Sequence, residues 1–194
     1  MELSNIIEKR RAYRSLEPVA VDRDLVSDLA GSAVLSLSCF NNQPWRYVFV
    51  YQKSRLEELF SALSKGNVWA QGASLIVAVA STQEYDCRIK GRDYYLFDTG
   101  MATAFMILRA TDLGLVAHPI AGYDELKVKQ ILGIPDSLTV ITLLIVGKHA
   151  GRTDPELSEK QAAWEAERPE RLAEEKFAFH NEYNKEAEDS DSSL

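Results

Sequence analysis

One eight-residue stretch, from Ser38 to Trp45, concentrates side chains that could hold a ligand. Ser38, Asn41 and Gln43 can donate and accept hydrogen bonds, and Phe40 and Trp45 add two large aromatic rings. Amide groups beside aromatic faces suit a flat molecule with a polar edge. A polar segment that contains proline is also typical of an ordinary turn between two core elements. The stretch alone therefore leaves both interpretations open.

A second candidate site is basic. Lys9, Arg10, Arg11 and Arg14 place four cations within six residues, directly after a short apolar helical pattern. Guanidinium groups bind phosphate through paired, charge-assisted hydrogen bonds, so the cluster could hold an anion. Basic side chains also suit the solvated carboxyl end of a helix, which is the alternative explanation. The cluster is too small for a nucleic-acid backbone, and we expect no nucleic-acid partner.

The elements that position these residues follow from hydrophobic periodicity. Helical patterns alternate with apolar strand patterns, which indicates an α+β, α/β-like fold with helices covering a sheet. We expect Asp124 to cap one helix, Ser54 to begin a capping box and Gly66 to end a helix. Asn67 and Trp69 are expected in a loop. The predicted helices are 3–10, 22–34, 54–63, 98–113 and 124–132, and the predicted strands are 47–51, 75–80, 115–118 and 140–146.

Composition limits the classes of protein. The 194 residues are 46% hydrophobic and 26% charged, as in globular proteins, and no apolar run approaches the ~20 residues of a membrane span. We find no leader-like start and expect a cytoplasmic protein without membrane partners. Two cysteines and three scattered histidines are too few for a disulfide framework or a zinc site, so no metal is expected. Cys39 is expected to be a small buried filler, with a redox-active thiol as the alternative.

Charge is placed unevenly along the chain. Residues 151–194 hold 6 Lys or Arg and 13 Asp or Glu, so the net charge of −7 lies there and residues 1–150 are neutral overall. We expect one domain over residues 1–183 and an acidic, disordered tail over 184–194.

Several separated motifs together resemble the nitroreductase family of flavin enzymes. Arg10-Arg11-x-x-Arg14 is similar to the family's N-terminal arginine motif, and Asn41-Asn42-Gln43-Pro44-Trp45 resembles its Asn-x-Gln-Pro-Trp loop. Asn67 and the turn Pro119–Asp124 also match in order. The segments 132–135, 167–171 and 174–177 complete a resemblance that covers about residues 6–183.

The resemblance implies an intertwined homodimer that binds FMN, with a central, mostly antiparallel sheet flanked by helices. It implies two sites at the subunit interface, where the flavin carries the chemistry and no residue acts as a dedicated catalytic acid or base. Arg14 would tune the flavin, and residues 38–41 would come from the partner subunit. The implied cofactor-binding residues are Arg10, Arg11, Ala12, Arg14, Ser38, Cys39, Asn41, Gln43, Asn67, Ala121, Gly122, Arg168 and Arg171.

The activity implied is hydride transfer from NADH or NADPH, through flavin N5, to a nitroaromatic, quinone or flavin acceptor. Four positions depart from the family pattern, because Ala12 and Cys39 replace serines, Leu37 replaces a proline, and Leu172 stands where a lysine is common. Two alternatives stay open. The chain could bind or store flavin with little turnover, or it could be a specialised dehalogenase or dehydrogenase of the same family.

Overall fold

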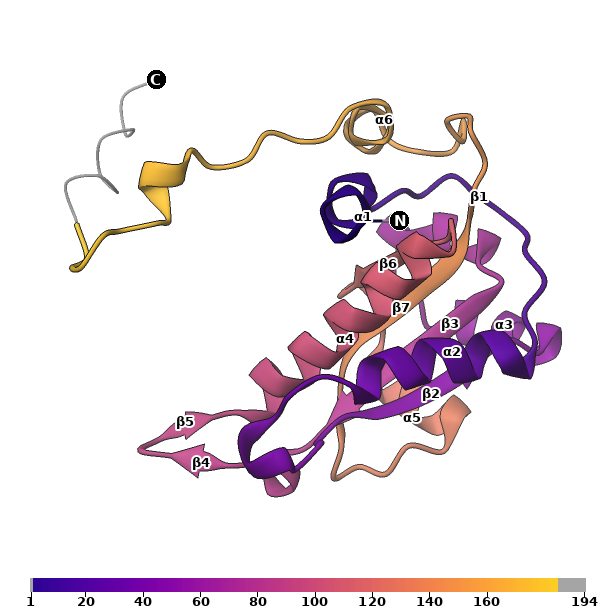
Figure 1. The fold of residues 1–194 in the computed structure, drawn as a ribbon. Coiled ribbons are helices and arrows are strands. Elements are labelled where there is room, and N and C mark those ends of the chain that lie inside the picture. Colours follow the sequence, from indigo (N-terminus) through magenta and orange to yellow (C-terminus); the bar gives the residue numbers. More distant parts are fainter. Residues whose placement is uncertain (1, 185–194) are drawn as a thin grey trace.

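The computed structural model describes residues 2–184, and its centre is one antiparallel sheet (Figure 1). Strand β3 (Leu75–Ser81) pairs with β2 (Arg46–Val50) and with the long strand β7 (Thr139–His149). Strand β7 also pairs with β6 (Val116–Ile120) and with the short strand β1 (Leu16–Glu17). Every one of these pairings is antiparallel, which confirms the predicted fold class of helices around a mostly antiparallel sheet.

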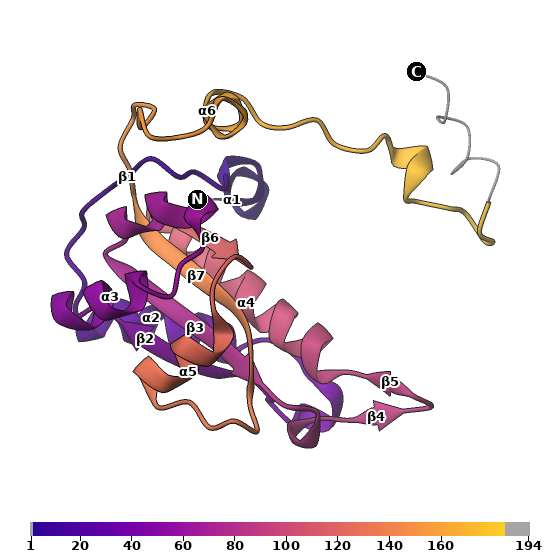
Figure 2. The same cartoon turned by 180° about the vertical axis from the view of Figure 1, so that it is seen from behind.

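Helices cover both faces of the sheet, and β3 is therefore buried on both sides. Leu75 and Val77 face a cluster with α2 (Arg23–Val34) and α4 (Tyr95–Asp112). Ile76 and Ala78 face the opposite cluster, with α3 (Lys53–Phe60), α5 (Glu125–Leu132) and the 3₁₀ segment η2 (Lys65–Gly72). Figures 1 and 2 show these two layers from opposite sides. The continuous apolar run at 75–80 thus predicted a doubly buried strand correctly.

The first and the last α-helix lie side by side at one end of the sheet. Helix α1 (Leu3–Lys9) contains no buried residue, and α6 (Glu159–Ala166) lies beside it in Figures 1 and 2. After α6 the chain continues as an extended segment with a 3₁₀ turn, η4 (Glu174–Lys176), and runs away from the sheet. The predicted acidic tail lies outside the described residues from position 185 onward.

The opposite end of the sheet carries a small hairpin. Strands β4 (Arg88–Ile89) and β5 (Arg92–Asp93) are joined by Lys90 and Gly91, both with positive φ. Two 3₁₀ turns lie at the same end, η1 (Cys39–Asn41) and η3 (Gln83–Tyr85). Among residues 2–184, no helix has both the length and the apolar character needed to cross a membrane.

Several predicted boundaries are wrong for local reasons. Helix α3 begins at Lys53 with Gln52 as its N-cap residue, so Ser54 lies inside the helix and no side-chain cap forms. The same helix ends at Phe60, and Gly66 and Asn67 lie in η2 instead of ending a helix or forming a loop. In contrast, the Asp124 side chain accepts a hydrogen bond from Lys127 N and caps α5 as predicted.

Candidate functional site

A basic cavity of about 190 Å³ lies where the N-terminal segment meets the chain that follows α6. It brings together most of the arginines expected to bind a phosphate, although Arg10 and Arg171 are far apart in the sequence. The residues that line it are Arg10, Arg11, Ala12, Arg14, Trp164, Arg168, Pro169 and Arg171.

The charges in this cavity are not neutralised. Among residues 2–184, no carboxylate forms an ion pair with Arg10, Arg168 or Arg171. Partial burial, followed by the like charges of Arg168, Arg171 and Arg11, lowers the pKa of Arg10 below its usual value. Guanidinium groups that repel one another in a partly desolvated cavity favour the binding of an anion between them.

A buried carboxylate holds the N-terminal segment against α6. Glu165 is 5% exposed, and its two oxygens accept hydrogen bonds from Arg14 N at 2.9 Å and Ser15 N at 3.0 Å. His149 Nε2 lies 3.3 Å from the same carboxylate, and the His149 ring stacks on Tyr13. Glu165 therefore fixes the backbone that carries Arg14.

Two of the predicted arginines donate to backbone carbonyl groups of a segment far away in the sequence, whereas Arg171 donates to the neighbouring Pro169 O. The guanidinium of Arg11 donates to Trp164 O at 2.9 Å, at the carboxyl end of α6. The guanidinium of Arg168 donates to Arg10 O at 3.0 Å, just after α1. These bonds join the two ends of the chain, so both side chains help to build the cavity that they line.

A continuous wall leads from this cavity to Gly122. The Arg14 guanidinium lies 5.8 Å from the centre of the Trp69 ring, and Trp69 Nε1 donates to Asn67 Oδ1 at 3.3 Å. Asn67 Nδ2 in turn donates to Gly122 O at 3.0 Å. A chain of contacts through the buried Trp69 thus links the predicted residues Arg14, Asn67 and Gly122, and we call these residues the wall. The exposed Ala121 directly precedes Gly122.

Trp69 also contacts a buried histidine behind this wall. The His118 ring lies 4.7 Å from the Trp69 ring, and His118 Nδ1 is 3.0 Å from Tyr13 O. Burial is the main cause that lowers the pKa of His118 to about 4, with a smaller contribution from the Arg14 charge. His118 is therefore neutral at pH 7 and packs as an uncharged ring.

The remaining predicted residues lie elsewhere on the same chain. Ser38, Cys39, Asn41 and Gln43 belong to the η1 loop, which contacts the first turn of α4 through a bond from Cys39 N to Asp98 Oδ2. Helix α1 lies toward the other end of α4 in Figures 1 and 2, and the arginine cavity begins at Arg10, which directly follows α1. One chain therefore does not bring the two groups of residues to one place.

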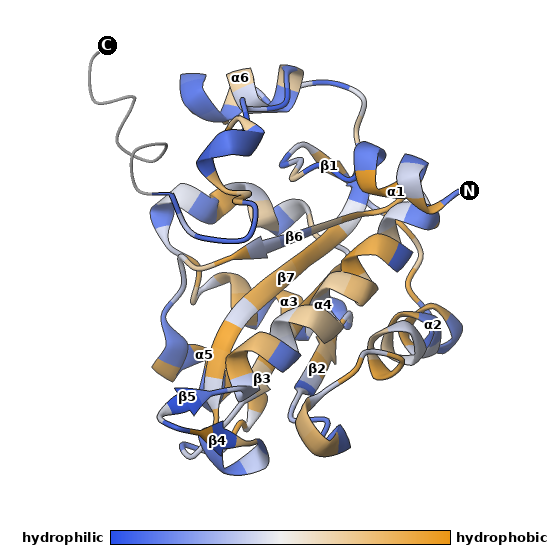
Figure 3. Ribbon diagram, turned by 60° about the vertical axis from the view of Figure 1, so that its left-hand side comes forward, coloured by the Kyte–Doolittle hydropathy of each residue, from blue (hydrophilic) through white to orange (hydrophobic). Residues whose placement is uncertain are grey.

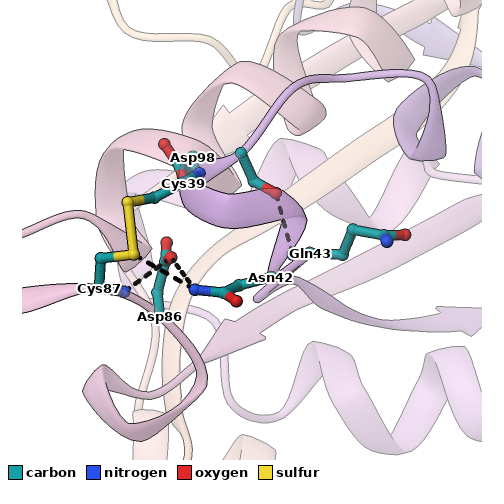
Figure 4. Close-up of a disulfide and its surroundings, with 7 residues drawn as sticks. Cys39, Asn42, Gln43, Asp86, Cys87 and Asp98 are labelled. Carbon is teal, nitrogen blue, oxygen red and sulfur yellow. Dashed lines mark hydrogen bonds between the residues drawn. A yellow bond between two sulfur atoms is a disulfide. The ribbon is translucent and has the colours of Figure 1, made fainter.

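Cys39 is not a buried filler, because it forms a disulfide with Cys87 (Figure 4). The two Cα atoms are 6.2 Å apart, and the bond joins residues 48 positions apart in the sequence. The sulfur atoms and an Asp86 oxygen lie within 4.8 Å of one another, as three metal ligands would. Since the two sulfur atoms are bonded to each other, neither is available as a thiolate ligand.

Sequence reasoning missed three residues of this arrangement. Glu165 occurs in a charged helix, where nothing marks it as the one carboxylate that turns inward. Asp98 is 2% exposed although it lies in the first turn of α4, where an exposed acidic residue is the usual pattern. Cys87 lies in a polar segment whose contact with Cys39 depends on tertiary structure. A fourth residue that sequence reasoning missed, Trp164, could have been noticed, because it is an aromatic residue in a polar helix.

Comparisons with known proteins point to one family. Residues 54–148 match the model of the nitroreductase family. An uncharacterised 15.4 kDa protein of Mycolicibacterium smegmatis is 34% identical over 122 residues, a match that covers 62% of this chain and 79% of the relative. A protein of Archaeoglobus fulgidus, provisionally named an NADH dehydrogenase/NAD(P)H nitroreductase, is 24% identical, with 75% of this chain and 84% of the relative covered.

A solved structure supports the same fold. The crystal structure of an oxidoreductase containing FMN superposes with a TM-score of 0.78 and 23% identity, covering 92% of this chain and 91% of the other. The arginine motif, the Asn67–Gly122 contact and the antiparallel sheet occur together in a chain whose middle half matches the family model. This chain belongs to the nitroreductase family.

Proposed function

We propose that the protein binds FMN, with its phosphate in the arginine cavity, and acts as an NAD(P)H-dependent oxidoreductase. The observation that carries this proposal is the unneutralised cavity around Arg10, Arg168 and Arg171, which adjoins the wall from Arg14 to Gly122. A phosphate at one end and a flat polar-edged ring along the wall would use both features. The FMN-containing structure that shares this fold, and the NAD(P)H nitroreductase name of one relative, support the same assignment.

The chain would hold the phosphate by charge. Arg10 and Arg171, with Arg168 beside them, would donate charge-assisted hydrogen bonds to the phosphate oxygens. Arg11 would lie toward the sugar-alcohol chain of the cofactor. The backbone of Ala12 is exposed in the cavity wall, but its methyl side chain adds no hydrogen bond.

The wall would position the ring. Bound FMN would supply the hydride chemistry at N5, between NADH or NADPH and a nitroaromatic, quinone or flavin acceptor. Arg14 would place a positive charge at the pyrimidine edge and so stabilise negative charge there. Asn67 would address the polar edge of the ring, and the Ala121–Gly122 backbone would offer an N–H group toward N5.

The site would be completed by a second copy of the chain. Because Ser38, Cys39, Asn41 and Gln43 lie at the far end of α4, they can reach the cofactor only from a partner subunit. The exposed apolar residues that a partner would cover lie on α1, on α4 and between α2 and β2: Leu3, Ile7, Leu35, Phe40, Phe97 and Phe105. Figure 3 shows orange, hydrophobic stretches on α1 and α4. We propose a homodimer on this surface, with residues 1–183 as one domain.

A visible spectrum of the purified protein, with mass spectrometry of the ligand released by heat, tests the cofactor. We expect flavin bands and the mass of FMN, followed by bleaching of the bands on mixing with NADH or NADPH. The double variant Arg10→Ala/Arg171→Ala should bind FMN at least about 100-fold more weakly, since each hydrogen bond to a charged group contributes about 1.5–3 kcal/mol. Arg23→Ala, an exposed arginine on α2, should bind like wild type. A colourless protein that takes up no added FMN would contradict the proposal.

A further inference from the structure

The two cysteines of the chain form a disulfide that joins a loop to a hairpin. Cys39 begins the η1 turn, and Cys87 directly precedes strand β4 (Figure 4). Both residues are half-buried in the single chain. Because the chain holds only these two cysteines, any thiol chemistry of the protein reports on this bond.

Polar groups surround the two sulfur atoms. Asn42 Nδ2 lies 3.3 Å from Cys87 Sγ and 3.2 Å from Asp86 Oδ1. Cys87 N donates to the same Asp86 oxygen at 2.8 Å, and Cys39 N donates to Asp98 Oδ2 at 2.6 Å. The side-chain amide of Asn42 reaches from the loop to the hairpin side, and Asp98, which binds Cys39 N, also interacts with Asp86. The disulfide is the one covalent connection between the loop and the hairpin.

The loop that is held in this way has an unusual backbone. Phe40, Asn41 and Gln43 all have positive φ, at 49°, 59° and 50°. Non-glycine residues adopt this region at a cost and keep it only where the surroundings enforce it. The Phe40 side chain is 86% exposed, so packing within the chain does not enforce it. Three bonds hold this backbone conformation. Gln43 N donates to Ser38 Oγ, Cys39 N donates to Asp98 Oδ2, and Cys39 forms the disulfide.

Resting on the proposed function, we propose that Cys39 and Cys87 form a reversible thiol–disulfide couple that controls how tightly the dimer binds FMN. A small dithiol attacks one sulfur atom as the thiolate, forms a mixed disulfide, and displaces the other cysteine. Its second thiol then closes a cyclic disulfide and releases the first cysteine. The dithiol loses two electrons and two protons, and the protein gains them as two thiols.

Reduction would act on the cofactor through the loop. Without the disulfide, the positive φ values at Phe40, Asn41 and Gln43 lose one of the restraints that hold them. The loop would then relax away from the conformation that presents Asn41 and Gln43 to the partner's site. The binding of FMN would weaken because part of its free energy would be spent on ordering the loop.

A purely structural role is the competing explanation. A disulfide between residues 48 positions apart restricts the unfolded chain and stabilises the fold without any switching. The two roles differ in one property, because a structural bond resists reduction in the native state while a regulatory bond is exposed and labile.

Treatment of the purified full-length protein with dithiothreitol under native conditions distinguishes them. Three readouts are needed, namely the intact mass, the rate of limited proteolysis within residues 38–45 and 82–95, and the Kd for added FMN. We expect a mass gain of two hydrogens, faster cleavage of both segments, and a rise in Kd on the order of tenfold. Oxidation with a small cyclic disulfide should restore the original mass, cleavage rate and Kd.

The variant Cys87→Ser provides the matched test. It should bind FMN with the Kd of reduced wild type and should not respond to dithiothreitol. Asn42→Ala removes the amide that reaches across the bond but keeps both cysteines, so it should keep the redox response. Chemical reduction of wild type decides the question even where a variant folds poorly.

Two results would overturn the proposal. The first is a bond that is reduced only after denaturation, and the second is an FMN affinity that is equal in the reduced and oxidised states. Absence of FMN binding in both states would refute the proposed function itself, and the coupling with it. Equal binding of FMN in both states, in contrast, refutes only the coupling.

Discussion

Asn67 Nδ2 donates a hydrogen bond to Gly122 O at 3.0 Å, and this contact joins η2 to the turn after β6. Ser64 N donates to the same carbonyl, also at 3.0 Å. The approach is close enough that a methyl group at position 122 would lie 2.4 Å from Ser64 Oγ and 2.5 Å from Asn67 Nδ2. The absence of a side chain at Gly122 therefore allows the amide of Asn67 to approach the Gly122 carbonyl.

Replacement of Gly122 by alanine should disturb this contact. We expect Gly122→Ala to destabilise the fold by about 1–3 kcal/mol, because overpacking forces Ser64 and Asn67 to move. The free energy of unfolding in urea and the Kd for FMN should both worsen. Gly31→Ala is the control, since no atom lies within 4 Å of a methyl group there, and in helix α2 it should stabilise by about 0.5–1 kcal/mol. A Gly122→Ala protein as stable as wild type would show that the backbone shifts without cost.

Glu165 gives a prediction about the arginine cavity. Glu165→Gln keeps the shape of the side chain but removes the charge that attracts Arg14 N and Ser15 N. We expect a loss of about 1–3 kcal/mol of unfolding free energy, as for other hydrogen bonds to charged groups. FMN binding should weaken as well, because the segment that carries Arg14 is less firmly held. Glu159→Gln, exposed on the same helix, should change either quantity by at most a few tenths of a kcal/mol.

Arg14 is expected to act on the flavin potential. Arg14→Ala should lower the midpoint potential by on the order of 30 mV if the guanidinium contributes about 1.4 kcal/mol to a two-electron couple. Reduction by NADH or NADPH should slow in the same variant. Arg14→Lys keeps a positive charge and should recover most of the potential. A midpoint potential in Arg14→Ala equal to that of wild type would remove Arg14 from this role.

His118 predicts a dependence of stability on pH. Its pKa is about 4 in the fold, mainly because of burial, against a usual value of 6.5. The unfolded chain therefore binds a proton more readily between these values, and stability falls as the pH is lowered through that window. We expect the contribution of His118 to be about 2 kcal/mol smaller at pH 5 than at pH 7.

Urea unfolding of wild type and His118→Gln at both pH values measures this contribution. The variant should lose less stability than wild type on going from pH 7 to pH 5. His180→Gln, which replaces an exposed histidine, should follow the wild-type curve. Parallel curves for wild type and His118→Gln would contradict a depressed pKa.

The proposed dimer surface can be tested by charge insertion. Phe97 on α4 is 63% exposed, and Phe97→Glu would place a carboxylate in the contact between subunits. We expect a monomer in sedimentation velocity and a loss of bound FMN, since the site needs both chains. Leu126→Glu is the matched control, because Leu126 is 68% exposed on α5, on the opposite face of the sheet. A dimeric Phe97→Glu protein would exclude this surface.

Local sequence predicted the elements that have strong local causes. The apolar run of β3, the cap at Asp124 and the helix end at Gly114, with φ of 75°, all depend on neighbouring residues and are confirmed. Ser54 does not cap α3, because the helix already begins one position earlier, at Lys53. Helix α4 begins at Tyr95 instead of Asp98, because the Asp98 side chain bonds to Cys39 N and not to its own helix.

The site was predictable in part. The types of residue at the arginine cavity were visible in the sequence, and their assembly from positions 10–14 and 164–171 agrees with that expectation. Glu165, which builds the cavity, was not visible, since nothing local distinguishes it from the other acidic residues of its helix. The Cys39–Cys87 bond was equally hidden, because two cysteines separated by 48 residues carry no information on their distance.

The bonds of Glu165 to Arg14 and Ser15 have a consequence for the synthesis of the protein. They span 151 and 150 positions of the chain, so the anion cavity cannot form until α6 has left the ribosome. Helix α1 buries no residue of its own, and it contacts the flank of α4. The sheet can close first, and the anion cavity forms only after the residues of α6 are available.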